Sequence, residues 1–238
     1  MSEKFEVLLL TPTPNEHKSV KAHLARNDFK NLAITLIECG PGRILATYAV
    51  TKQFFTKPPK DLKKFLLMGA GTCGTLALDL VGGDMIVSNS AIISDWRMDD
   101  GRSISVSPYG GFDYRSPQEP QISKMVLECD DPLVLKTIDA AVSKGFKVGR
   151  LLTSESFMTG KDHKLSLGRT YGCLACEMES GVFGYVANAL INVSWLNIRV
   201  VADTLDEALS DYLRMERDMT EILGNKAVEI LKVLDEIV

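Results

Sequence analysis

The sequence predicts an α/β fold built as one domain over residues 1–238. Three observations support this prediction. Apolar runs of strand length alternate with helical segments along the chain, as in Phe5–Leu10 and the capped helix that follows it. A late apolar run of β-type residues stops abruptly at Asp203, as strands do where a sheet opens into a binding crevice. The length of 238 residues lies at the upper end of the size range of single domains, which form one hydrophobic core.

Composition points to a globular protein that binds a small molecule. Hydrophobic residues make up 45% of the chain, charged residues make up 24%, and the mean hydropathy is +0.04. The net charge of −4 is mild and unclustered, so we expect neither nucleic acid nor a membrane surface as a partner. No stretch approaches the roughly 20 apolar residues of a membrane span. The N-terminal segment lacks the features of a secretory signal, and a cytoplasmic location is therefore expected.

The first third of the chain predicts two strand–helix pairs and a third strand. Thr13 has the pattern of a helix N-cap, with Pro14 in the first helical position and Glu16 in the third, which is a capping box. This helix is expected to run to about Ala25. We expect the following elements at Leu32–Glu38 (strand), Arg43–Phe55 (helix) and Lys64–Met68 (strand).

A glycine-rich stretch, Gly69–Gly74, follows the third predicted strand and matches the GxGxxG pattern of dinucleotide-binding proteins. That site requires a helix directly afterwards and an acidic residue about 20 residues further on. Here a Gly-Gly-Asp turn and another strand follow, which leaves room for one helical turn at most. The dinucleotide interpretation is therefore weak, and we expect no cofactor.

The second half contains a long loop and ends in a helix. Residues Asp95–Pro120 are rich in Gly, Ser and Pro, and their aromatic side chains favour a lid or a subunit contact. Further elements are expected in this order: a helix from Asp131, a strand at Lys147–Thr153, a loop at Ser154–Gly160, the stretch Gly172–Glu207 with the strand that ends at Asp203, and a terminal helix at Ser210–Ile237. We find no internal repeat.

The cysteines and histidines predict no metal site. The five cysteines are odd in number and irregularly spaced, and we expect them to be reduced and structural. Cys173 and Cys176 form a CxxC pair, but a zinc site needs a second ligand pair and none has suitable spacing.

Three segments in the right order resemble the nucleoside phosphorylase and nucleosidase superfamily. They are MGAGTCGTLALDLVGGDMIVS after a strand, SESFMTG in a loop, and CEMESGVFGYVANAL followed by RVVADTLDE. The match covers nearly the whole chain. The resemblance implies a three-layer α/β/α sandwich around a twisted mixed sheet. It also implies a homodimer or higher homo-oligomer, because relatives complete the site with a neighbour's residues.

Within the superfamily, the chain resembles methylthioadenosine/S-adenosylhomocysteine nucleosidases most, with futalosine hydrolase close to them. The phosphorylases hold phosphate with arginines in the first loop and just before the GTCG-like turn. This chain has Thr11–Asn15 and Gly69-Ala70 at those points, without arginine. Because phosphate recognition favours fixed arginine forks, the resemblance implies hydrolysis of a purine nucleoside.

Two carboxyl groups are the candidate catalytic residues. A purine leaves more easily once it is protonated, and Asp203 is the candidate acid; the apolar strand before it would raise its pKa. The alternative is an aspartate that caps the next segment. Glu16 aligns with the water-activating glutamate of the nucleosidases, and its alternative role is the capping box. Both roles are compatible only if the Glu16 carboxylate turns toward the pocket.

The Glu-Met-Glu segment is expected to hold the ribose. Glu179 offers two acceptor oxygens to the vicinal hydroxyls, and Met178 offers an adaptable wall. Glu177 would face the same side on an extended segment, and its alternative is a solvated or ion-paired carboxylate. Arg199 needs an acidic partner if buried, and Glu16 or Glu179 would serve.

Three further residues are expected to contact the substrate. Phe157 would stack on the base, with core packing as the alternative. Met158 would contribute a contact mainly from its backbone. Thr72 would present its hydroxyl to the sugar, or be merely a turn residue.

Two other functions stay open. The first is a phosphorylase whose phosphate site uses other residues, such as Arg43 or a neighbour's Arg97. The second is a nucleoside-binding protein without turnover, which is plausible because Ala202 stands where relatives carry a serine that orients the aspartate.

Overall fold

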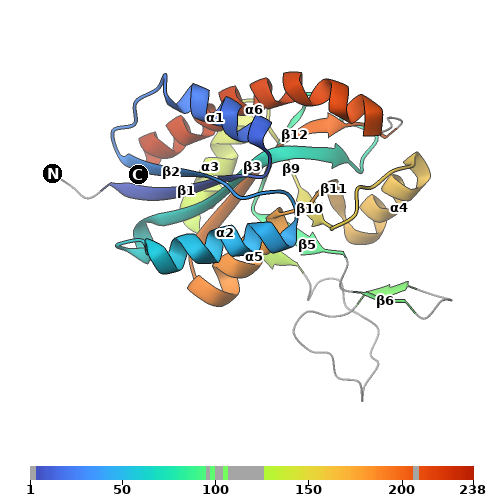
Figure 1. Ribbon diagram of the computed structural model, residues 1–238, viewed down its shortest axis with the longest axis horizontal. Coiled ribbons are helices and arrows are strands. Elements are labelled where there is room, and N and C mark those ends of the chain that lie inside the picture. The colour runs from blue at the N-terminus through green and yellow to red at the C-terminus, as the bar shows by residue number, and fades with distance from the viewer. Residues whose placement is uncertain (1–3, 95–96, 100–103, 107–125, 206–208) are drawn as a thin grey trace, which may run out of the picture.

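The computed structural model describes residues 4–94, 97–99, 104–106, 126–205 and 209–238, and its centre is a 10-stranded mixed sheet (Figure 1). The strands of this sheet are β1 (Phe5–Thr11), β2 (Leu32–Glu38), β3 (Phe65–Thr75), β4 (Met85–Ser88), β5 (Ser90–Ile93), β8 (Leu127–Glu128), β9 (Lys147–Val148), β10 (Arg150–Thr153), β11 (Cys173–Glu177) and β12 (Ser194–Asp203). The strand order is β8-β5-β10-β11-β3-β12-β4-β9, with β1 between β2 and the first half of β3.

Helices cover both faces of the sheet. The main helices are α1 (Pro14–Leu24), α2 (Arg43–Thr56), α3 (Pro132–Ser143), α4 (Lys161–Tyr171), α5 (Ser180–Tyr185) and α6 (Leu209–Ile237), and α5 continues into a π-helical segment, η3 (Val186–Ile191). A short 3₁₀ turn, η1 (Leu62–Lys64), leads into β3. In Figure 1, α1 and α6 lie above the sheet and α2 and α5 lie below it; α3 packs against α6. The expected three-layer α/β/α sandwich with a mixed sheet is confirmed. Within the described residues, no helix is long and apolar enough to cross a membrane.

Strand β3 is the central strand, and its neighbours create an opening beside it. Along one edge, β12 pairs with β3 from Leu66 to Gly74. Along the other edge, β1 pairs with β3 only as far as Gly69, and β11 takes over only at Gly74. Between these two points, residues 70–73 have no strand partner on that edge in the described sheet. Functional side chains can therefore reach the middle of β3 from the loop after β1.

The glycines of β3 make room for polar side chains of β12. In the parallel register, Gly69 lies opposite Asn197, Gly71 opposite Arg199, and Gly74 opposite Asp203. A Cβ atom added at position 71 would overlap with Arg199 Nη1, and one added at position 74 would lie 2.7 Å from Asp203 Oδ2. The glycine pattern that resembles a dinucleotide motif thus lets buried charged groups lie against the strand.

Several sequence predictions differ from the structure in their boundaries. The third strand continues through Gly69–Gly74, so this stretch is strand and not a turn. The segment Lys147–Thr153 forms two strands, since β9 pairs with β4 and β10 pairs with β5 and β11. Helix α4 was not predicted. Its buried positions include Lys164 and Gly168, so the helix lacks an apolar stripe.

The other elements agree closely with the predictions. The capping box of α1 is present, with Thr13 as N-cap and Glu16 at the third position. Helix α2 and the terminal helix α6 begin within one residue of the expected positions. Of the long loop, the described parts are two short antiparallel strands, β6 (Arg97–Asp99) and β7 (Ile104–Val106). The aromatic residues assigned to a lid or subunit contact (Trp96, Tyr109, Phe112 and Tyr114) lie outside the described residues.

The close approach of β3 and β12 leads to a test. A Gly71→Ala substitution would force Arg199 to move, because the added methyl group overlaps its guanidinium. Overpacking of this kind costs about 1–3 kcal/mol. We expect the free energy of unfolding, measured in urea, to fall by that amount. An unchanged value would show that glycine is not required at this position.

Candidate active site

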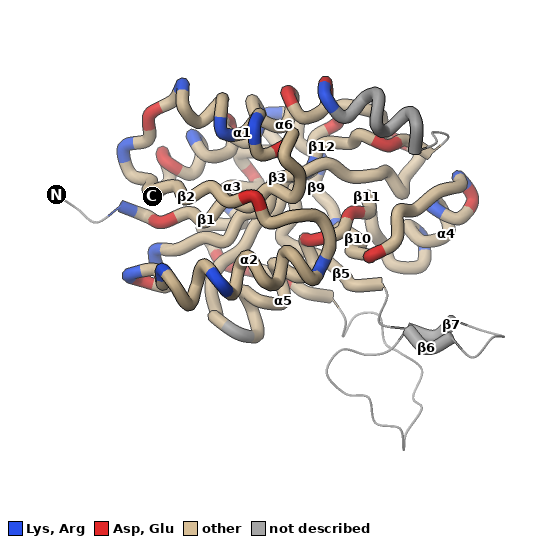
Figure 2. The backbone as a smooth tube through the Cα atoms, in the orientation of Figure 1, with Lys and Arg blue, Asp and Glu red and all other residues tan. Residues whose placement is uncertain are grey.

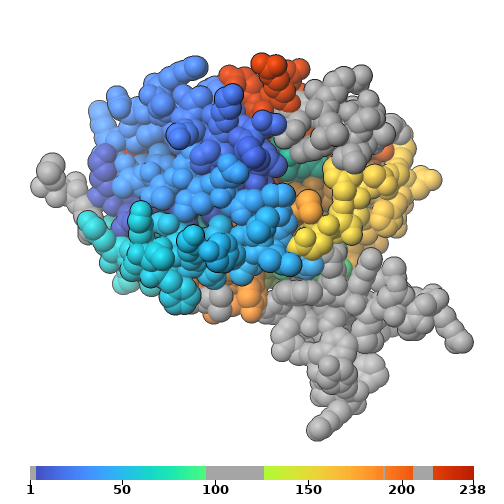
Figure 3. Space-filling view, in the orientation of Figure 1, coloured from blue at the N-terminus to red at the C-terminus, as the bar shows by residue number. Residues whose placement is uncertain are grey.

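One cavity of about 190 Å³ opens beside β3 at the carboxyl ends of β1 and β12. In the space-filling view, the blue N-terminal part and the yellow α4 region border a hollow with orange atoms at its base (Figure 3). The cavity is lined by Pro12, Thr13, Glu16, Pro41, Thr72, Cys73, Gly74, Ser156, Phe157, Met158, Cys176, Glu177, Met178, Glu179, Arg199 and Asp203. All nine residues predicted for the site are in this lining, although they come from widely separated parts of the chain.

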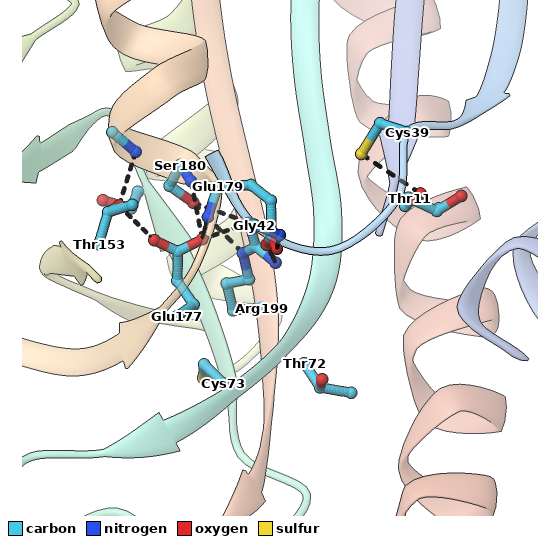
Figure 4. Close-up of polar contacts among 12 residues, drawn as sticks. Thr11, Cys39, Gly42, Thr72, Cys73, Thr153, Glu177, Glu179, Ser180 and Arg199 are labelled. Atoms are coloured by element: carbon cyan, nitrogen blue, oxygen red, sulfur yellow. Dashed lines mark hydrogen bonds and ion pairs between the residues drawn. The ribbon is translucent and has the colours of Figure 1, made fainter. Parts of the chain in front are cut away.

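Arg199 is the electrostatic centre of the cavity wall. It projects from β12, is fully buried, and lies between two carboxylates (Figure 4). Its Nη2 is 2.5 Å from Glu177 Oε2, and its Nη1 is 3.2 Å from Glu179 Oε2. Its Nε and Nη2 also donate to Ser180 Oγ. Burial lowers the pKa of Arg199, but the carboxylates outweigh burial and raise it, so the guanidinium stays charged.

Glu177 supports the wall through ion pairing and backbone hydrogen bonds. Its Oε2 accepts hydrogen bonds from the backbone N–H groups of Glu179 and Ser180, at 2.9 and 2.7 Å. Its Oε1 accepts from Thr153 Oγ1, which itself accepts from the backbone of Gly181. With both oxygens engaged, Glu177 fixes the turn between β11 and α5. The ion-paired alternative therefore describes this residue better than a direct role at the ribose.

Glu179 is the carboxyl at the N-terminus of α5. Its Oε1 accepts a hydrogen bond of 2.8 Å from the backbone N–H of Gly42, at the start of α2, while its Oε2 faces Arg199. Burial raises its pKa to about 8, although Arg199 and the Gly42 hydrogen bond act in the opposite direction. The carboxyl can therefore exist in both protonation states near neutral pH.

Glu16 performs its capping role and faces the cavity at the same time. Its Oε2 accepts from the backbone N–H of Thr13, which completes the capping box. Its Oε1 accepts a hydrogen bond of 2.7 Å from the backbone N–H of Thr72, in the unpaired section of β3. Burial raises the pKa of Glu16, with Arg199 and these hydrogen bonds acting against it. The capping box is therefore present, and because Glu16 also lines the cavity, capping does not exclude a role there.

Asp203 lies at the end of β12, but its surroundings differ from the prediction. The apolar setting expected around the carboxyl is wrong, because Lys164 Nζ lies 2.7 Å from Asp203 Oδ2. Lys164 is fully buried and also donates to the backbone carbonyl of Thr204. This lysine was not predicted from the sequence. Its buried face, formed with Gly168 and Tyr171, shows the i, i+4, i+7 spacing that could have revealed it.

The remaining predicted residues form the other walls. Phe157 is 40% exposed and lies in the loop between β10 and α4, where an aromatic ring remains accessible to a ligand. Met158 packs partly against a small core cluster that includes Leu152 and Cys176. Thr72 contributes its backbone N–H to Glu16, so its place in the site does not depend on its hydroxyl alone.

The cysteine thiols that line the cavity are unsuited to nucleophilic chemistry. Burial raises the pKa of Cys176 to about 12 and that of Cys73 well above its usual value. All five cysteines are free and buried. In the parts of the chain that the structure describes, no group of three or more His, Cys, Asp or Glu side chains could hold a metal ion.

The raised pKa of Glu179 predicts how stability depends on pH. The folded protein holds a proton on this carboxyl between its ordinary pKa of 4.5 and about 8, whereas the unfolded chain has lost it. Stability contributed by this group therefore falls as pH rises through that window, by at most about 1.4 kcal/mol per pH unit.

Urea unfolding at several pH values between 5 and 9 would measure this effect. A Glu179→Gln substitution should flatten the curve, since glutamine does not titrate. Glu236→Gln, at an exposed position of α6, is the matched control and should leave the curve unchanged. Parallel curves for the parent and Glu179→Gln would contradict the assignment.

Comparison with known proteins identifies relatives of this chain. A curated 5'-methylthioadenosine/S-adenosylhomocysteine nucleosidase of Staphylococcus haemolyticus is 23% identical over 94% of this chain and 89% of its own length. A DeoD-type purine nucleoside phosphorylase of Thermoanaerobacter sp. is 30% identical over 58% of the chain, which spans about half of that protein.

Solved structures show the same fold. A Helicobacter pylori 5'-methylthioadenosine nucleosidase mutant with 5'-methylthioadenosine in its active site superposes with a TM-score of 0.75, at 16% identity over the full length of both chains. Futalosine hydrolase of the same organism gives 0.74 at 17% identity, covering 98% of each chain. The model of the phosphorylase superfamily matches residues 2–238. The chain belongs to the phosphorylase superfamily.

Proposed function

We propose that this protein is a purine nucleosidase, which hydrolyses the N-ribosidic bond of a nucleoside to the free base and a ribose derivative. The observation that carries the proposal is the meeting of three carboxyl groups and one accessible aromatic ring in a single cavity. Glu16, Glu179 and Asp203 supply the carboxyls, and Phe157 supplies the ring. The similarity to a nucleosidase of Staphylococcus haemolyticus supports the same assignment.

The charge of the cavity suits the transition state of this reaction. Breaking the bond builds positive charge on the ribose ring, as in glycoside hydrolysis. Four buried carboxyl groups (Glu16, Glu177, Glu179 and Asp203) line the cavity together with one buried guanidinium (Arg199), so acidic groups outnumber basic groups among the described lining residues. Such fixed groups stabilise a developing cation without reorganising during the reaction. Glu179 accepts hydrogen bonds from the ribose hydroxyls, and Met178 packs against the sugar.

The two catalytic carboxyls act on opposite parts of the substrate. Asp203 donates a proton to a purine nitrogen as the bond from the base to the sugar breaks, and the bonding electrons leave with the base. Water attacks the anomeric carbon, and Glu16 accepts its proton. The raised pKa of Glu16 favours this step, because a carboxylate that binds protons more tightly is a better base near neutral pH.

The arrangement of the arginines favours water over phosphate as the attacking group. Among the described residues that line the cavity, Arg199 is the one arginine, and it forms ion pairs with Glu177 and Glu179. Arg43, considered above as a phosphate ligand, forms an ion pair of 3.1 Å with Glu155. A phosphate dianion would also approach the buried carboxyls at a high electrostatic cost. Phosphorolysis is the second candidate reaction, because a purine nucleoside phosphorylase is among the relatives.

The proposal includes a small-molecule partner and no cofactor. Proton transfer and hydrolysis need only the side chains described above. Blue and red positions are interspersed along the described backbone in Figure 2, which does not favour nucleic acid as a partner. We place the protein in the cytoplasm, and its five free cysteines are consistent with a reducing compartment.

A nucleoside panel in phosphate-free buffer tests the proposed reaction. We expect release of the purine base from one or more nucleosides, with the 5′ substituent varied among hydroxyl, methylthio and homocysteinyl groups. Asp203→Asn and Glu16→Gln should each lower kcat by about 10²–10⁴-fold, the usual contribution of an acid or base.

The outcomes separate the three candidate functions. Turnover that requires added phosphate would establish a phosphorylase and exclude the proposed hydrolysis. A binding protein would be favoured if the parent bound a nucleoside tightly and showed no base release above that of the Asp203→Asn variant.

We also propose a homo-oligomer that uses the outer face of α2. Ile44, Tyr48 and Phe55 recur along one side of this helix and are 81%, 60% and 89% exposed. Large apolar side chains grouped on one face are typical of an interface. The helix begins beside the cavity, where Gly42 binds Glu179, so a second copy seated on α2 would adjoin the site.

Light scattering tests this assembly. We expect a mass of at least twice the 26.2 kDa of one chain. Tyr48→Glu combined with Phe55→Glu should yield monomers, because burying the new charges is unfavourable. Val142→Glu is the control, since Val142 is a half-exposed apolar residue on α3, which packs against α6. A parent protein of 26.2 kDa in solution would refute the oligomer.

A further inference from the structure

We propose that Lys164 is a positioning residue for Asp203: it fixes the carboxyl in the cavity and supplies the positive charge that stabilises the carboxylate left after proton donation. This inference rests on the proposed function and assigns a role to a residue outside the cavity lining. Lys164 acts through Asp203 and does not touch the substrate.

The geometry around Lys164 is that of a fixed charge. Its ammonium is fully buried and lies 2.7 Å from both Asp203 Oδ2 and the carbonyl oxygen of Thr204. Asp203 is itself 3% exposed, and it belongs to the cavity wall whereas Lys164 does not. The lysine therefore holds the Oδ2 oxygen of Asp203 without lining the cavity itself.

Burial of this lysine is difficult to explain by packing alone. Placing an ammonium in the interior carries a large desolvation cost, and a hydrophobic residue of similar volume at such a site is often neutral or stabilising. The neighbouring Ala202 has no polar group that could orient the aspartate. The chain instead places a long cation on α4 that reaches the end of β12 and holds two successive residues, Asp203 and Thr204.

The proton-transfer step gives this cation a function. When Asp203 donates its proton, its O–H bond breaks, an N–H bond forms on the purine, and a carboxylate remains in a buried site. The electrons of the broken bond to the sugar stay with the base. A carboxylate in such a site is costly without a counter-charge. The Lys164 ammonium is in place before the reaction and stabilises the carboxylate as it forms.

The test combines single and double variants of the pair. Lys164→Met should lower kcat by about 10²-fold, in the range for loss of one fixed stabilising charge, and leave KM within about 3-fold. In the Asp203→Asn background, the same change should have no further effect on kcat, because Lys164 acts through Asp203. Arg169→Met, an exposed cation on the same helix, is the control and should match the parent.

Chemical rescue separates this role from a purely structural one. Lys164→Ala leaves space for a small amine, and added ethylammonium should restore part of the lost kcat, whereas equimolar sodium or tetramethylammonium should not. Circular dichroism should report a folded protein for each variant assayed. The double variant Lys164→Met/Asp203→Asn removes both charges together, so it keeps the comparison available if Lys164→Met alone does not fold.

The outcomes distinguish failure of the proposed function from failure of the role of Lys164. A parent protein that releases no base from any nucleoside contradicts the proposed function itself. An active parent with Lys164→Met at parental kcat overturns the role of Lys164 and leaves the function intact. Additive losses in the double variant, or an Ala variant that ethylammonium does not rescue, also overturn it.

Discussion

The ion pairs of Arg199 with Glu177 and Glu179 are the constraint on which the site depends. A buried arginine is tolerable only with acidic partners, and here it joins β12 to the turn between β11 and α5. Glu177 accepts a hydrogen bond from the backbone of Ser180 in that turn. Glu179 accepts one from the backbone of Gly42, the residue before α2. One guanidinium thus brings together elements far apart in the sequence. Its charge also moderates the cost of keeping several carboxyls in one buried wall.

The sheet provides the place for this cluster. Because β1 leaves β3 after Gly69 and β11 joins it only at Gly74, the backbone of Thr72 is available to Glu16. The glycine at position 71 then lets the Arg199 side chain lie across the strand. A crevice at the carboxyl ends of parallel strands is where α/β proteins commonly bind ligands. The pocket is therefore a consequence of strand pairing as much as of side-chain chemistry.

Some of these features could be predicted from the sequence and others could not. The capping box at Thr13 and Glu16 and the strand ending at Asp203 depend on local patterns, and both are present. The resemblance to known nucleosidases brought together residues that local patterns cannot relate. Lys164 was missed because α4 is largely polar; the spacing of its buried positions indicates an inward face, but no local pattern indicates a partner 39 residues away. The continuation of β3 through its glycines was missed because such residues normally indicate a turn.

The most direct measurement is a crystal structure of the Asp203→Asn protein with a bound purine nucleoside. We expect the ribose hydroxyls within hydrogen-bonding distance of Glu179, the base against Phe157 with its imidazole edge toward position 203, and Glu16 on the opposite side of the sugar. A nucleoside bound outside this cavity, or one with its ribose turned away from Glu179, would contradict the proposed roles of these residues.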